Sequence, residues 1–138
     1  MEELASRARG CMLGLACGNL LGLPNEFKRT PPAVPGTDID PAELGRQWDD
    51  DLAQAAQLAG ALLRPGGFDT ADFARRLGHW ARTNGRGMGG QTYRVLELQA
   101  RGLAPLAAAR HVWESSDRQA AGNGGVMRVA RVGLRHHG

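Results

Sequence analysis

The sequence contains three consecutive carboxylates, Asp49, Asp50 and Asp51, which are its strongest candidates for binding a metal ion. Carboxylate oxygens are the ligands that Mg²⁺ and Mn²⁺ prefer, and adjacent acids can each hold one ion of a close metal pair. Acidic residues are also favoured at a helix start, where they cap free amides and meet the positive end of the helix dipole. The run alone leaves both interpretations open.

Two glycine-rich segments are candidates for holding a phosphate group. Glycines before a helix let the backbone approach a ligand and aim its amides at an anion, although the same residues also make plain turns between helices. The candidate positions are Gly87, Met88 and Gly89 in the first segment and Gly122, Asn123 and Gly124 in the second.

Glu26 is a third candidate, because it lies where an apolar segment opens into a proline-rich stretch. A Glu at such a junction is usually solvated, but it can also be a catalytic carboxylate beside a cleft. The histidines favour no catalytic role: His79 and His111 fall in amphipathic segments, where a surface or core-edge position is expected, and His136 and His137 close the chain.

The elements that must position these residues are all predicted to be helices. Ile occurs once and long Val or Ile runs are absent, so strands have little support. Residues 28–47, rich in proline, predict a long irregular loop. Apolar periodicity and capping residues predict helices over residues 4–21, 50–63, 70–83, 91–100, 105–113 and 126–134.

The first of these helices is expected to be mostly buried, with Gly14 and Gly18 on a face that another helix can approach closely. The last is expected to follow a glycine loop over residues 120–125. The sequence as a whole predicts a single all-α domain over residues 1–138.

Composition excludes several classes of protein. Of the 138 residues, 42% are apolar and 22% charged, which is typical of globular proteins. The net charge is +3, but the Arg residues are spread along the chain, so nucleic-acid binding is not favoured. Cys11 and Cys17 suit neither a disulfide nor a metal site and are expected to be reduced core residues. The acidic start and the broken apolar stretch argue against a signal or a membrane span, so we expect a cytoplasmic location.

The order of the motifs resembles the ADP-ribosylglycohydrolase family, which includes dinitrogenase reductase-activating glycohydrolases and the J1 crystallins. Residues 9–22 look like its first helix, with the pattern G-x-x-x-G-x-x-x-G-D-x-x-G. Residues 48–63 are similar to W-T-D-D-T-x-M-x-x-x-L-A-x-x-L, and residues 86–90 to R-G-x-G-x-G. Residues 121–134 are similar to G-N-G-x-x-M-R-x-A-x-x-x-L, which is the strongest single match.

The resemblance implies an orthogonal helical bundle, which would be an incomplete ADP-ribosylglycohydrolase fold. It also implies an activity, the cleavage of the glycosidic bond between ADP-ribose and a protein side chain. It implies a pair of Mg²⁺ or Mn²⁺ ions held by Asp50 and Asp51, with Asp49 as a weaker third ligand. It places Glu26 near the scissile bond. The two glycine segments would line the ADP-ribose groove.

The sequence departs from the family pattern at several positions. Asn19 stands where the family has Asp, and Asp49 and Leu52 stand where it has Thr. The D-x-D-T segment that closes the family's metal site does not occur. Residues 38–41 are superficially similar to it, but they lie in the proline loop and have Pro41 where the family has Thr. We therefore expect marginal stability alone, with a complementary carboxyl-terminal chain or self-association completing the fold.

Three functions follow as hypotheses. The first is a metal-dependent hydrolase that is incomplete in this chain. The second is a catalytically degenerate ADP-ribose-binding module, favoured by Asn19, Leu52 and the missing D-x-D-T. The third, supported by charge alone, is a basic helical module that binds nucleic acid.

Overall fold

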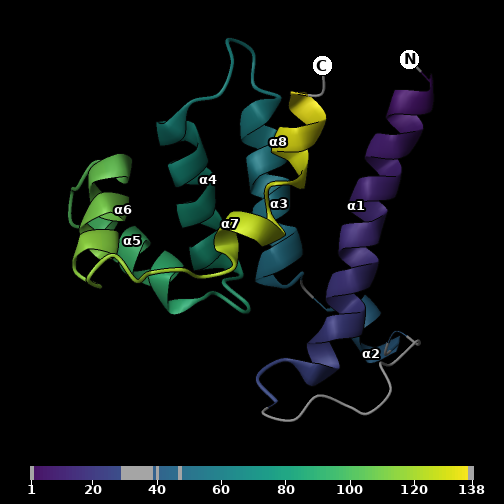
Figure 1. Cartoon of the computed structure of the whole chain (residues 1–138), viewed down its shortest axis with the longest axis horizontal. Helices are drawn as coiled ribbons and strands as arrows, with labels where there is room; N and C mark the ends of the chain where they lie inside the picture. The colour runs from purple at the N-terminus through teal and green to yellow at the C-terminus, as the bar shows by residue number, and fades with distance from the viewer. Residues whose placement is uncertain (1, 29–38, 40, 47, 137–138) are drawn as a thin grey trace. The chain divides into compact units, whose positions relative to one another are not determined.

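A computed structural model describes residues 2–28, 39, 41–46 and 48–136. The chain divides into two compact units, Met1–Trp48 and Asp49–Gly138 (Figure 1). The described residues form helices and no strand, which confirms the predicted all-α class. Among them, no helix is long and apolar enough to cross a membrane. That residues 1–138 form one domain stays a prediction.

The first unit is built on one long helix. Helix α1 spans Glu2–Gly22 and is followed by a 3₁₀ turn, η1, over Leu23–Asn25, which contains Pro24. The predicted helix is therefore confirmed, but its predicted burial is wrong, because α1 contains no buried residue. Cys11 and Cys17 are free, as predicted, yet Cys11 is half-buried and Cys17 is exposed, so neither is a core residue.

The exposure of α1 has a simple physical reason in its own unit. Among the described residues there, the partners available are η1 and the four-residue helix α2, Pro41–Leu44, which offer little surface for packing. A Cβ built on Gly14 or Gly18 meets nothing within 4 Å, so no described element of this unit packs closely on these glycines. Helix α2 also corrects the fully irregular loop predicted for residues 28–47, of which 29–38, 40 and 47 lie outside the described residues.

The second unit contains four longer helices with bounds close to those predicted. They are α3 (Asp50–Leu62), α4 (Thr70–Thr83), α5 (Gly90–Ala100) and α6 (Pro105–Glu114). Asp69 caps α4, because its carboxylate accepts the backbone N–H of Ala71 at 2.9 Å. Pro105 occupies the first turn of α6, where its missing N–H costs nothing.

Helix α4 lies at the centre of this unit. It packs against α3 on one side and against α5 and α6 on the other (Figure 1). The core cluster consists of Ala53, Leu77 and Trp80, with Phe73 and Met88 packed against it. Burying such side chains contributes roughly 1.5–3 kcal/mol for each large apolar residue. This core holds the start of α3 in place.

The last predicted helix is interrupted. Helix α7 covers Gly124–Met127 and helix α8 covers Ala130–Arg135, and both pack on α3. The prediction of one helix over residues 126–134 is therefore wrong, and α7 begins within the predicted glycine loop. Glycines and β-branched valines are poor helix formers, so this stretch has little intrinsic tendency to stay continuous.

Candidate functional site

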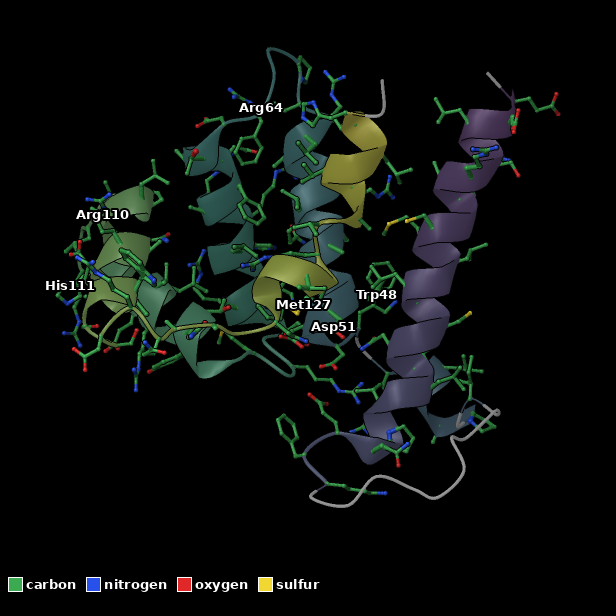
Figure 2. The ribbon with its side chains drawn as sticks, viewed as in Figure 1. Trp48, Asp51, Arg64, Arg110, His111 and Met127 are labelled. Atoms are coloured by element: carbon green, nitrogen blue, oxygen red, sulfur yellow. The ribbon has the colours of Figure 1, made fainter. Side chains whose placement is uncertain are left out.

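The acidic run lies at the start of α3, as the sequence predicts. Asp49 precedes the helix in an extended conformation, and Asp50 and Asp51 form its first turn. Asp51 is labelled in Figure 2. Asp49 and Asp50 are only 4% and 9% exposed, whereas Asp51 is half-buried. The Asp49 side chain makes no capping hydrogen bond. Helix capping therefore does not account for its burial.

Gly87 brings the first glycine segment directly against these carboxylates. A Cβ built on Gly87 would lie 2.0 Å from Oδ1 of Asp49 and 2.9 Å from Oδ1 of Asp50. Its φ of +75° is also one that side-chain-bearing residues rarely adopt. Only glycine fits this position, and two carboxylate oxygens face the same point on its backbone.

The neighbours of Gly87 have different surroundings. Met88 packs against the core cluster around Trp80. Gly89 lies at the edge of a cavity in the same unit, just before the start of α5. Of the three predicted positions of this segment, Gly87 therefore lies against the carboxylates, Met88 packs in the core and Gly89 lines the cavity.

A cavity of about 440 Å³ lies beside the acidic run, within the second unit. Most of its wall is apolar, with contributions from α4, α5 and α6, including Phe73, Leu77 and Trp113. Its polar groups include Asp50, Gln91 and Arg128, and residues 122–125 also line it. A mostly apolar hollow with a few converging polar groups is the usual form of a small-molecule site.

The second glycine segment is fixed by a side chain of α5. The backbone N–H of Gly122 donates to Oε1 of Gln91 at 3.1 Å. A Cβ on Gly122 would lie 2.7 Å from that oxygen, so the contact needs glycine. Asn123 is exposed just before α7, and Gly124 begins that helix. Gly122, Asn123 and Gly124 all line the cavity.

Two polar side chains that the sequence analysis gave no role connect α7 to the acidic run. Gln54 is completely buried in α3, and its Nε2 donates to Oδ2 of Asp50 at 3.4 Å. Nη1 of Arg128 donates to Oε1 of Gln54. The signal available in the sequence was a Gln four residues after Asp50, on the helix face shared with buried apolar residues.

Arg128 is itself withdrawn from water. Its guanidinium carbon lies 6.0 Å from the centre of the Phe73 ring. Burial lowers the pKa of Arg128, and the negative charge of Asp50 opposes this shift. Arginine stays protonated in proteins, so this end of the cavity combines a half-buried cation with a buried carboxylate.

Glu26 belongs to the first unit. It is exposed and follows η1, where its backbone N–H donates to the carbonyl oxygen of Leu23 at 3.2 Å. The next residue, Phe27, has a φ of +60°, so the chain turns sharply here. A catalytic role for Glu26 stays a prediction.

The donor set at the start of α3 fits a hard divalent cation in kind. Asp49 and Asp50 present oxygens to one point, and Mg²⁺ commonly takes one or two carboxylates and completes its shell with water and phosphate. Within the described residues there is no cluster of three or more His, Cys, Asp or Glu side chains placed to hold a metal.

Comparison with known proteins gives consistent matches. A sequence model described as ADP-ribosylglycohydrolase matches residues 1–138. The chain is similar to the ADP-ribosylarginine hydrolase Tri1 of Pseudomonas putida, with 29% identity over 140 residues, covering 96% of this chain and 37% of that protein. It is similar to the ADP-ribosylhydrolase ARH3 of Bos taurus, with 31% identity over 147 residues, covering 94% and 39%.

An uncharacterised protein of Archaeoglobus fulgidus is 32% identical over 148 residues, covering 99% of this chain and 44% of the relative. The chain thus spans less than half the length of each of these curated relatives. No solved structure matches it. Because the family model matches the whole chain, this protein belongs to the ADP-ribosylglycohydrolase family.

Proposed function

We propose that this chain forms the metal-binding and ADP-ribose-binding wall of a hydrolase that removes ADP-ribose from modified protein side chains. The observation that carries the proposal is the convergence of Asp49 and Asp50 on Gly87 beside a cavity of about 440 Å³. Membership of the ADP-ribosylglycohydrolase family also supports a functional role for Asp49 and Asp50.

Asp49, Asp50 and Asp51 are the residues that would hold Mg²⁺ or Mn²⁺. When bound, such an ion activates water at neutral pH and orients the oxygens of a sugar. The protein's own contribution is to fix carboxylate positions, and the Gly87 backbone lies so near Asp49 that a Cβ built there would come within 2.0 Å of its Oδ1. Asp49, a charged residue in place of Thr, adds negative charge to the site.

Gly89 and the segment Gly122–Gly124 would hold the ADP-ribose. These residues line the cavity, and the Gly122–Gln91 hydrogen bond fixes the second segment against α5. Glu26 would be the carboxylate nearest to the bond that is cleaved. Fixed backbone donors orient a ligand without the entropy cost of ordering side chains.

Calorimetry with ADP-ribose, in the presence and absence of Mg²⁺ or Mn²⁺, tests this proposal on the full chain. We expect binding that the metal strengthens, and we expect Asp50→Asn to abolish the effect of the metal. Asp117→Asn is the matched control, because Asp117 is an exposed acid beyond α6. Equal affinities with and without metal would contradict the metal site.

A binding module without hydrolysis is the second candidate. It is favoured by the absence, across the described residues, of a three-ligand metal cluster and by Leu52, whose side chain offers no oxygen. Release of ADP-ribose from modified arginine or serine peptides separates the two candidates. Binding with no release would identify a degenerate module, and release would identify a hydrolase. The name of the P. putida relative makes ADP-ribosylarginine the first substrate to try.

Nucleic-acid binding loses support in the structure. Several arginines are paired with acids of their own helix or its neighbouring turn, as in Arg7–Glu3, Arg64–Asp69 and Arg101–Glu97. Paired arginines leave less free positive charge for phosphates. We therefore expect no salt-dependent retention of the chain on immobilised DNA.

We further propose that another chain, a complementary carboxyl-terminal segment or a second copy, covers part of this one. Large apolar side chains are exposed in the second unit, including Leu63 at 75%, Leu106 at 71% and Val126 at 77%. Exposed apolar surface favours association. Sedimentation velocity at increasing concentration should show a rising average mass, and a constant monomer mass would contradict self-association.

A further inference from the structure

Gln54 is the largest completely buried side chain among the described residues, and it is polar. A buried amide is costly unless its oxygen and nitrogen both find partners. Here both are used: Nε2 donates to Oδ2 of Asp50, and Oε1 accepts from Arg128. The side chain therefore bridges an anion and a cation.

The chemistry of Arg128 fixes which way this amide points. A guanidinium has donors and no acceptor, so only the amide oxygen of Gln54 can face it. The amide NH₂ must then face Asp50, where it acts as a donor to the carboxylate. The reversed amide would place two donors together on one side and two acceptors on the other. Arg128 thus determines the orientation in which Gln54 meets Asp50.

This arrangement divides the two oxygens of Asp50 between two directions. Oδ2 is directed to Gln54, whereas Oδ1 faces Gly87, where Oδ1 of Asp49 also points. Because both oxygens turn together about the Cβ–Cγ bond, the hydrogen bond from Gln54 to Oδ2 also restrains Oδ1. Under the proposed function, Oδ1, on the Gly87 side, is the oxygen that would face a cation.

We infer that Gln54 is a positioning residue, which orients the Asp50 carboxylate for a divalent cation and links it, through Arg128, to the segment before α8. The inference rests on the proposed function. Gln54 stands where the pattern W-T-D-D-T-x-M has Met, and Met cannot make either hydrogen bond, so the bridge is a feature of this chain. Gly124 leaves space for the Arg128 side chain, since a Cβ there would lie 3.2 Å from Nη2 of Arg128.

Groups that orient a metal ligand through a hydrogen bond typically change metal affinity by about 10- to 100-fold when removed. The test is a Mn²⁺ titration of the full chain, followed by electron paramagnetic resonance of free Mn²⁺. We expect Gln54→Met, which keeps the volume but not the hydrogen bonds, to weaken Mn²⁺ binding by about 10- to 100-fold. Gln57→Met, one turn further along α3 and only half-buried, is the matched control and should bind as the unmodified chain does.

A second measurement reports on position directly. In the unmodified chain, the side-chain amide resonances of Gln54, assigned by through-bond connection to its own backbone, should shift when Mg²⁺ is added. Those of Gln57 should stay in place. A role in packing alone predicts no metal-dependent shift at Gln54. Because this measurement uses the native sequence, it decides the question even if Gln54→Met does not fold.

The outcomes separate the inference from the function on which it rests. If the unmodified chain binds no Mn²⁺, the proposed metal site fails and the positioning role fails with it. If the unmodified chain binds Mn²⁺ and a folded Gln54→Met binds it equally well, only the positioning role is overturned. Static Gln54 resonances during Mg²⁺ binding overturn it in the same way.

Discussion

Two buried aspartates at the beginnings of neighbouring helices differ in the partners that bind their carboxylates. Asp72, in the first turn of α4, is 3% exposed, and both of its oxygens are bound by arginines of its own helix: Arg75 to Oδ1, and Arg76 to Oδ2 at 2.6 Å. Asp50, in the first turn of α3, is 9% exposed and is bound by Gln54, which depends on a partner 74 positions away in the sequence.

The difference lies in where the compensating charge comes from. Asp72 is neutralised within one helical turn, so its burial follows from local spacing and stabilises the helix pair. Gly60 in α3 makes this possible, because a Cβ there would lie 2.7 Å from Nη1 of Arg76. Asp50 instead faces Gly87 and a cavity, and it accepts from Gln54, which in turn is bound by Arg128. A buried acid that lines a mostly apolar cavity is the better candidate for function.

The largest effect is expected at Gly87. Gly87→Ala combines a positive φ with a contact of 2.0 Å to Asp49, so we expect a loss of about 2–4 kcal/mol in the free energy of unfolding, from backbone strain and overpacking. Urea denaturation followed by circular dichroism measures it. Gly89→Ala is the control, since its Cβ meets nothing within 4 Å, and it should lose far less. Equal losses would mean that the Gly87 contact is not tight.

The next largest effect is expected from replacing each of the two aspartates, Asp50 and Asp72, by asparagine. We expect Asp50→Asn to weaken Mn²⁺ binding at least about tenfold, because it removes a charged ligand. Asp72→Asn should lower the midpoint of unfolding and leave Mn²⁺ affinity unchanged, because Asp72 binds only arginines of α4. The two variants, titrated with Mn²⁺ and melted side by side, should give opposite profiles. Loss of Mn²⁺ binding in both would show that Asp72 is no independent control.

A smaller effect is expected from acid. The hydrogen bond from Arg76, with the charges of nearby arginines, lowers the pKa of Asp72 below its ordinary value, although burial opposes the shift. The folded state therefore holds the Asp72 proton less tightly than the unfolded chain. The resulting stabilisation is complete above the unfolded pKa, near 4, and is lost as the pH falls through the folded pKa. Urea midpoints between pH 6 and pH 3 should fall less steeply in Asp72→Asn; an equally steep fall would assign acid sensitivity to other carboxylates.

The smallest effect is expected in the second glycine segment. A Cβ on Gly122 would lie 2.7 Å from a side-chain oxygen that can move, so Gly122→Ala should cost about 1 kcal/mol. Gly125→Ala, inside α7 with no neighbour within 4 Å, should stabilise by about 0.5–1 kcal/mol through helix propensity. Chemical denaturation of both variants gives the comparison. A destabilising Gly125→Ala would indicate that α7 depends on glycine flexibility.

Much of the helical framework could be predicted from the sequence. Helix α4 was predicted with both bounds correct, because Asp69 supplies a cap and Asn84 and Gly85 end the apolar pattern. The burial of α1 and the continuity of the last helix were predicted wrongly. In both cases the local pattern was right for a helix, but packing partners decide burial, and long-range contacts decide where a weak helix breaks.

The sequence by itself determined the helices, the acidic start of α3 and the glycine segments, because these depend on residue types within a few positions of one another. Only the tertiary structure brought Gly87 against Asp49 and joined Asp50 to Arg128 through Gln54. Such contacts join residues tens of positions apart. Close approach and buried hydrogen bonds are properties of three-dimensional packing, which no local pattern encodes.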